Sequence, residues 1–220
     1  MTTRAGIRAL IRETLVDTII WPDKSINAWI NDGIRDYSNY FRRQVNATIT
    51  VTVTGTREYS LTSYTGIAEV LRVEYPKGED PPRYLLFRSE TGNFKDLPAY
   101  DVRGEPPITL VIGEEPTAAE EIELTYAADH TVPTADTSVL TIPDIHLELI
   151  RLFVTWQAIK RVEINETADP DRLSMILGQL GINAVRAERV YRYKLEEYRK
   201  KMAASGLSGP WIMDSRDRIY

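Results

Sequence analysis

The stretch Val45-Asn46-Ala47-Thr48-Ile49-Thr50-Val51-Thr52-Val53-Thr54 alternates apolar and polar side chains with a period of two. That period is typical of a β-strand with one buried face and one face in water. On either side of this stretch the apolar side chains recur every three or four positions, as they do along one face of a helix. The chain therefore predicts an α+β fold in which a β-rich insertion interrupts a helical body.

Two short helices are predicted before this strand. The first is expected to end before Pro22, and its shared apolar face consists of Ile7, Leu10, Ile11 and Leu15. Ser25 occupies the position of an N-cap for a second helix that runs to about Tyr40. The apolar stripe of that second helix consists of Ile26, Trp29, Ile30, Ile34, Tyr37 and Phe41.

The middle of the chain contains further strand patterns. Gly55 ends the opening strand, and turns rich in Pro and Gly separate the later ones. The later strands are predicted at residues 58–61, 69–75, 84–87, 108–112 and 121–126. Together they predict a small, mostly antiparallel sheet.

Helical spacing returns after Pro143. The buried side of this helix is predicted to consist of Ile145, Leu149, Leu152, Phe153, Trp156 and Ile159. Ile150 and Val154 lie on a different side of the same helix, which indicates contact with a second neighbour. The helix is therefore expected to be central.

A last, long helix is predicted from near Asp169 or Asp171 to about Ala203, roughly 50 Å at about 1.5 Å per residue. Its apolar stripe consists of Leu173, Leu177, Leu180, Ala184, Ala187, Tyr191, Leu195, Tyr198 and Met202. Gly178 and Gly181 interrupt this pattern, and they indicate either close helix packing or a local break.

Residues 205–220 combine a Gly/Ser-rich hinge with side chains of the kinds that anchor protein interfaces. One interpretation is a docking peptide that orders on binding, and the other is a tail that folds back onto its own domain. The docking residues would be Trp211, Ile212, Met213, Arg216, Arg218, Ile219 and Tyr220. The expected organisation is N-terminal helices in 1–44, a β-rich insertion in 45–143, C-terminal helices in 144–204 and an extended C-terminal tail in 205–220.

Composition argues against most enzyme mechanisms. The 220 residues include no cysteine and only two histidines, His130 and His146, so thiolate chemistry is excluded and a metal role has few ligands to use. Signatures of phosphate loops, dinucleotide-binding turns, nucleophile elbows and zinc proteases are missing. No apolar stretch approaches the ~20 residues of a membrane span. We expect a soluble, non-enzymatic protein that needs no metal or cofactor and is made in the cytoplasm.

Charge is distributed unevenly along the chain, whose formal net charge is −5. Residues 104–129 contain seven carboxylates and no Lys or Arg, whereas residues 186–201 contain seven cations and three carboxylates. The acidic run predicts either paired carboxylates of a hydrolase or the wet face of a strand, and its alternation favours the wet face.

The basic segment 186–201 is open to three interpretations. The first interpretation is that it binds nucleic-acid phosphates, and the second is that it is a solvated helix face with its own ion pairs. The third is that it faces the acidic strands of a neighbouring copy. For the last interpretation the expected inter-subunit residues are Arg186, Arg189, Arg192, Glu121 and Glu123.

The succession of these elements resembles a known family. Ile26-Asn-Ala-Trp-Ile-Asn-Asp-Gly-Ile-Arg-Asp-Tyr37 is followed by Glu58-Tyr-Ser-Leu61, by Leu97-Pro-Ala-Tyr100 and by Ile108-Thr-Leu-Val111 with Pro116. Ile122-Glu-Leu-Thr-Tyr126 and then Leu140-Thr-Ile-Pro143 lead into the long helix. This order is similar to that of head-to-tail adaptor, or neck, proteins of tailed bacteriophages.

The resemblance implies a virion protein of the neck, between capsid and tail. In that family twelve copies form a ring under the portal protein, join the capsid vertex to the tail and extend the DNA channel. The implied partners are the portal protein, other copies of the chain, a tail, nozzle or next neck protein, and passing DNA that is not bound by sequence. The large sheet region leaves another neck or tail-tube-like subunit as an alternative, and the basic helix leaves a nucleic-acid-binding module.

Overall fold

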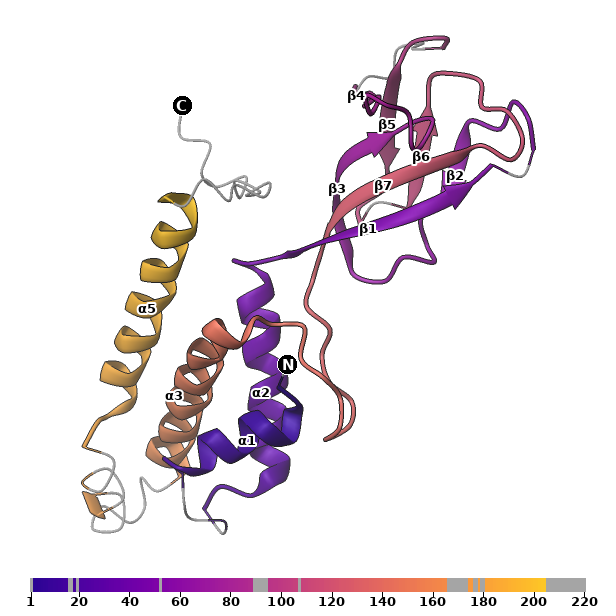
Figure 1. Ribbon diagram of the computed structural model, residues 1–220. Helices are drawn as coiled ribbons and strands as arrows, with labels where there is room; N and C mark the ends of the chain where they lie inside the picture. Colours follow the sequence, from indigo (N-terminus) through magenta and orange to yellow (C-terminus); the bar gives the residue numbers. More distant parts are fainter. Residues whose placement is uncertain are drawn as a thin grey trace. The chain divides into compact units, whose positions relative to one another are not determined.

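The computed structural model describes residues 2–15, 18, 20–51, 53–88, 95–106, 108–165, 174–175, 178 and 181–204 (Figure 1). Its backbone divides into two compact units. The helical unit contains the chain up to Phe41 and the chain from His130 to the end of the last helix. The β unit is Arg42–Asp129. The expected α+β class is confirmed. The domain boundaries expected from the sequence, at residues 44, 143 and 204, stay a prediction.

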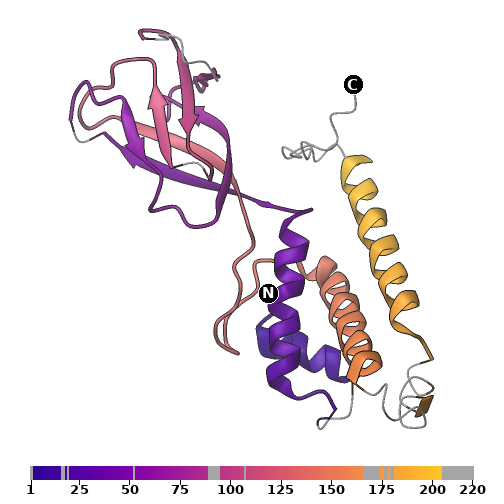
Figure 2. The same ribbon diagram turned by 180° about the vertical axis from the view of Figure 1, so that it is seen from behind.

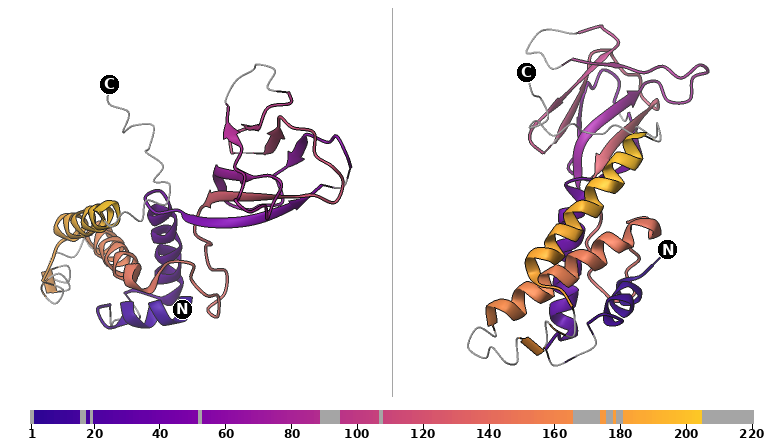
Figure 3. Two further views of the ribbon diagram at one scale, coloured as in Figure 1. Left: turned by 45° about the horizontal axis from the view of Figure 1, so that its top comes forward. Right: turned by 90° about the vertical axis from the view of Figure 1, so that its left-hand side faces the viewer.

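The helical unit is built from α1 (Arg4–Arg12), α2 (Asp23–Ser38), the short 3-10 helix η1 (Asp144–His146), α3 (Leu147–Asn165) and α5 (Ala184–Ala204). Helix α3 lies between α2 and α5 and also packs against α1 (Figures 2 and 3). It is buried on more than one side, because Leu149, Ile150, Phe153, Val154 and Ala158 all lose their contact with water. These side chains supply most of the surface on which the other helices pack.

The start of α2 differs from the prediction. The helix begins at Asp23, because Pro22 is fixed in an extended conformation and its carbonyl already accepts from the amides of Ser25 and Ile26. Ser25 is therefore inside the first turn and not the N-cap. Its hydroxyl accepts a hydrogen bond from Arg161 of α3 at 2.7 Å instead.

The prediction of one uninterrupted helix from residue 169 or 171 to residue 203 is wrong. Gly181 has a φ of +64°, in the left-handed region that breaks a helix, so the local-break interpretation of this glycine is confirmed. Helix α5 starts afresh at Ala184, whose amide donates to Glu163, while the Asn183 side chain accepts from the amide of Arg186. The predicted stripe residues Leu173, Leu177 and Leu180 lie outside the described residues.

In the part of the β unit that the structure describes, seven strands form two sheets, where one sheet was expected. The first sheet has the order β1-β7-β3, from β1 (Arg43–Thr50), β7 (Glu121–Ala128) and β3 (Ile67–Glu74). The second has the order β2-β6-β5-β4, from β2 (Glu58–Ser60), β6 (Thr109–Ile112), β5 (Ala99–Arg103) and β4 (Leu86–Phe87). Every pairing is antiparallel except β4 with β5.

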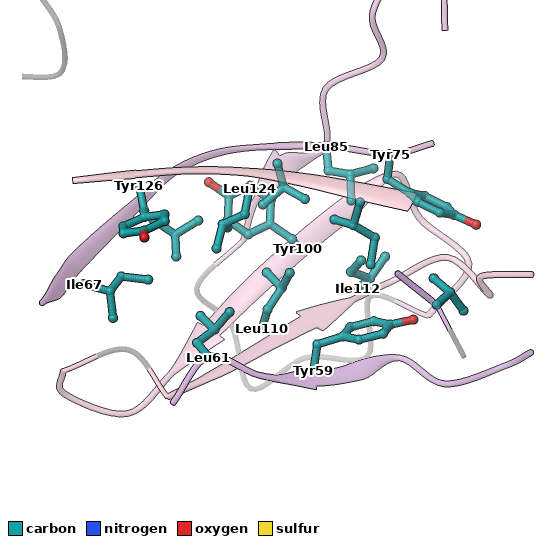
Figure 4. Packing of buried hydrophobic residues seen from close by; sticks show 14 of the residues in the cluster. Tyr59, Leu61, Ile67, Tyr75, Leu85, Tyr100, Leu110, Ile112, Leu124 and Tyr126 are labelled. Carbon is teal, nitrogen blue, oxygen red and sulfur yellow. The ribbon is translucent and has the colours of Figure 1, made fainter. Parts of the chain in front are cut away.

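The two sheets bury one shared apolar core. Leu124 enters it from the first sheet, and Leu110 and Ile112 enter it from the second (Figure 4). Val73 and Ile122 of the first sheet belong to the same core. Strand β5 was not predicted, because consecutive residues Ala99 and Tyr100 are both buried and show no alternation. A strand buried on both faces loses the period of two from which strands are recognised.

Three apolar side chains expected to be buried are exposed. Leu10 is at the edge of the α1 stripe and is 39% exposed, and Val53 lies beyond the end of β1 and is 61% exposed. Ile145 is 72% exposed because it belongs to η1, whose tighter turn puts it out of phase with the stripe of α3.

Candidate protein interaction surface

Most carboxylates of the acidic run in residues 104–129 lie near cations or hydrogen-bond donors of the same β unit. Arg83 pairs with Glu114, and Arg57 approaches Glu115 at 3.4 Å. Glu120 accepts hydrogen bonds from the Tyr75 hydroxyl and from the Thr117 amide, which hold the pKa of its carboxyl below the usual range. Cations from other parts of the β unit therefore meet much of this negative charge inside the unit.

Glu121 and Glu123 share a single cation. The Lys77 ammonium lies 3.4 Å from Glu121 and 3.8 Å from Glu123, and the Asn46 amide donates to Glu123 at 3.3 Å. Ile122 and Leu124, which alternate with them, are fully buried, so the wet-face interpretation of these carboxylates is confirmed. A contact of Glu121 and Glu123 with another copy would have to compete with Lys77.

The inner face of α5 holds the helix to the rest of the helical unit. Tyr191 is 1% exposed, stacks on Trp156 with ring centroids 6.1 Å apart, and donates its hydroxyl to Asp36 of α2. Burial, reinforced by the Asp36 carboxylate, raises the pKa of Tyr191. Ala184, Ala187 and Leu195 are buried along the same stripe, as predicted.

Arg192 takes part in this internal packing. Its guanidinium donates to the Tyr40 hydroxyl at 3.2 Å and lies 3.9 Å from Asp36 and 3.8 Å from Glu188. The same group lies 5.7 Å from the centre of the Trp156 ring. These contacts tie α5 to α2 and α3, which is a role inside the subunit.

The outer α5 face, which we define as Val185, Arg186, Arg189, Tyr193 and Lys200, points away from this packing. All five side chains are exposed, Val185 at 68% and Tyr193 at 70%. Within the described part of the chain, Arg186, Arg189 and Lys200 form no ion pair. Arginine and tyrosine beside an apolar side chain are the residue types that contribute most at protein interfaces.

Sequence reasoning identified part of this surface. Arg186 and Arg189 were expected at an interface, and the structure leaves both exposed, whereas it gives Arg192 internal partners. Val185 was missed, although its position off the buried stripe, four residues before Arg189, could have indicated it. The docking residues proposed for the tail, Trp211 to Tyr220, lie outside the described residues.

The described part of the chain contains neither a cluster of metal ligands nor a helix that could span a membrane. Among the described residues, His, Asp and Glu side chains form no group of three or more that could hold a metal ion. His130 and His146 are buried in the helical unit. In the same described ranges, no helix is long and apolar enough to cross a membrane.

The fold is that of a two-unit α+β protein, and the outer α5 face is exposed on its helical unit. A family model described as SU10 adaptor protein matches residues 2–202. The chain belongs to this family, which confirms the resemblance to phage adaptors noted from the sequence. No curated protein matches the chain significantly.

Proposed function

We propose that the chain forms a ring under the portal of a tailed phage and joins the capsid vertex to the tail while extending the DNA channel. Membership of the adaptor family makes it a phage structural protein of the virion. Its partners would be the portal protein, neighbouring copies, and a tail, nozzle or next neck protein.

The observation that carries this proposal is the extent of the family match. Residues 2–202 include the helices, both connections between the units and the whole β unit. A shared domain inserted in an unrelated protein would match only one unit. The match therefore supports a role for the whole subunit, not for the helical unit alone.

Two surfaces would make the contacts. The tail residues Trp211, Ile212, Met213, Arg216, Arg218, Ile219 and Tyr220 would bind the portal protein. The outer α5 face would contact the neighbouring copy, with Arg186 and Arg189 meeting exposed carboxylates there. Arg192 would act indirectly, by holding α5 in place.

Co-purification with a phage portal protein tests the proposal. Full-length chain is expected to form ring-shaped complexes seen by electron microscopy, and a chain truncated after Ser205 is expected to lose them. Rings with both forms would keep the adaptor role and remove the tail from portal binding. No complex with any cognate portal protein would contradict the proposal.

A charge-matched pair of variants tests the outer α5 face. Arg186→Glu with Arg189→Glu should disrupt the ring, whereas Arg35→Glu with Arg103→Glu changes the net charge equally at exposed sites that have their own ion partners, Asp32 and Glu58. Equal loss of rings in both double variants would point to general electrostatics and against a specific contact.

A nucleic-acid-binding function has one observation in its favour, because Arg186, Arg189 and Lys200 share the outer α5 face with Tyr193. Phosphate contacts by these three cations predict that log K falls with log salt with a slope of roughly −2.7. A slope near zero for the isolated full chain would rule this function out and leave the protein interface.

A further inference from the structure

Both histidines of the chain lie in one aromatic cluster of the helical unit. We define the stem cluster as Tyr37, Phe41, His130, His146 and Tyr198. The ring of Tyr37 lies 4.8 Å from Phe41, 5.1 Å from His130 and 5.8 Å from His146, and His146 lies 4.8 Å from Tyr198. Five parts of the unit, namely α2, the segment that follows it, η1, α5 and the segment after Asp129, meet through these five rings.

Both covalent connections to the β unit begin at residues of the stem cluster. Phe41 is the last residue of the helical unit before the β unit, and His130 is the first residue after it. The amide of His130 donates to the Ser38 hydroxyl at 3.0 Å, and that hydroxyl donates to the carbonyl of Ile34 at 2.8 Å. We call Phe41 and His130 the two stems, and both are fixed to the last turns of α2, since the Phe41 amide also donates to the Tyr37 carbonyl at 2.9 Å.

One buried hydrogen bond joins Tyr37 of α2 to His146 of η1. The Tyr37 hydroxyl lies 2.5 Å from Nδ1 of His146, and each of these side chains is 2% exposed. Burial raises the pKa of Tyr37, so the phenol keeps its proton. With the phenol as donor and Nδ1 of His146 as acceptor, this bond suits a neutral imidazole ring. Burial also lowers the pKa of His146 from the ordinary value of 6.5, which favours the neutral ring.

The charged groups on the surrounding elements already have other partners. On α3, Glu148 accepts from the Tyr198 hydroxyl at 3.4 Å, and on η1, Asp144 accepts from Thr2 at 2.9 Å. On α5, Lys194 pairs with Glu197 at 3.1 Å. The polar group of α2 in the stem cluster is the Tyr37 hydroxyl. The titratable group of the segment after Asp129 is His130, whose Nδ1 lies 3.1 Å from the Thr141 hydroxyl.

A second proton on His146 would therefore create a buried cation, and Tyr37 is a neutral partner that cannot compensate its charge. Such a charge is costly unless the site opens to water. Opening of the site would separate η1 from the end of α2, where both stems are attached.

We propose that the stem cluster is a pH-sensitive latch, which holds the two connections to the β unit while His146 is neutral and releases them when His146 is protonated. The latch goes beyond the adaptor function and does not depend on any partner. Because the closed state binds fewer protons than the open state, closure is fully favoured above pH 6.5, the ordinary histidine value, and weakens as the pH falls below it.

Hydrogen exchange of the full chain, followed by mass spectrometry, tests the latch. After correction for intrinsic rates, peptides covering residues 37–44 and 128–146 should exchange roughly tenfold faster at about pH 5.5 than at about pH 7.5, because one open-state histidine gains a proton. Peptides from α1 provide the internal control and should keep the same corrected rate. Equal corrected rates at the stems at both pH values would overturn the proposal.

Two substitutions separate His146 from His130. His146→Asn keeps an acceptor but cannot titrate, and it should abolish the pH dependence at the stems, while His130→Asn should leave it. The reverse pattern would overturn the assignment to His146.

A measurement on the unmodified chain covers the case in which His146→Asn fails to fold. Nuclear magnetic resonance titration of the histidine rings should give His146 a pKa below 6.5. Tyr37→Phe should raise that pKa, because the hydroxyl that favours the neutral ring is gone. A His146 pKa at or above 6.5 in the folded full chain would contradict the latch.

Discussion

The acidic strands of the β unit and the basic helix α5 are both dense in charge, but the structure treats them differently. Lys77 lies within 4 Å of Glu121 and Glu123, and Arg83 pairs with Glu114, so carboxylates of the acidic run meet cations that are distant in sequence. On α5, Arg186 and Arg189 point outward and meet no such partner among the described residues. The difference follows from geometry, because the fold of the β unit brings the connection with Lys77 and Arg83 beside the acidic run. The outer face of a helix offers its side chains only positions three and four residues away.

The largest expected effect is on the inner face of α5. Tyr191→Ala should destabilise the helical unit by about 3–5 kcal/mol, because a fully buried aromatic ring is replaced by a cavity. Urea unfolding followed by tryptophan fluorescence measures the change. Tyr193→Ala, on the outer face of the same helix, should cost no more than about 0.5 kcal/mol, and equal losses would contradict the two-faced description of α5.

A smaller effect is expected for the half-exposed arginine of the inner contact. Arg192→Met should cost about 0.5–1 kcal/mol, because it removes an exposed ion pair and a cation–aromatic contact but keeps the aliphatic stem. Arg189→Met is the matched control and should be close to neutral in the isolated chain. A larger cost for Arg189 would show that this side chain has an internal partner.

The acidic strands predict a pH effect. Because the pKa of Glu120 is lowered by hydrogen bonds from Tyr75 and Thr117, the ionised form stabilises the β unit above the ordinary value of 4.5, and this contribution is lost as the pH falls through the lowered pKa. Glu120→Gln should therefore flatten the pH dependence of thermal unfolding below about pH 4.5. An unchanged profile would mean that other carboxylates dominate.

The smallest effect is expected where one cation is shared. Lys77→Met should destabilise the β unit by at most about 0.5 kcal/mol, since the pairs with Glu121 and Glu123 are partly exposed. The loss should shrink further at high salt, which screens these charges. A loss that does not depend on salt would indicate packing of the lysine stem and not electrostatics.

Part of the fold was predictable because local patterns carry it. The alternation of Ile122 and Leu124 with Glu121 and Glu123 identified β7, and the stripe from Ala184 to Leu195 identified the buried side of α5. Strand β5 was not predictable, because it is defined by its pairing with β6 and not by its own sequence period. The division of the strands into two sheets was not predictable either, since it depends on which strands pair.

The composition of the basic segment allowed part of the outer α5 face to be predicted. A basic segment with arginine and tyrosine indicated an interaction face, but sequence could not separate Arg192 from Arg189. They are three residues apart on one helix, and only the position of Asp36 and Trp156 turns the first inward.

The sequence by itself determined the α+β class, most of the helices and strands, the resemblance to phage adaptors and the uneven charge. These follow from side-chain period and composition, which act over a few residues. Tertiary structure alone decided which charges are matched, how the strands divide into two sheets and that both histidines meet at the two stems. Those outcomes depend on contacts between residues distant in sequence, such as Tyr37 with His146, and no local pattern encodes them.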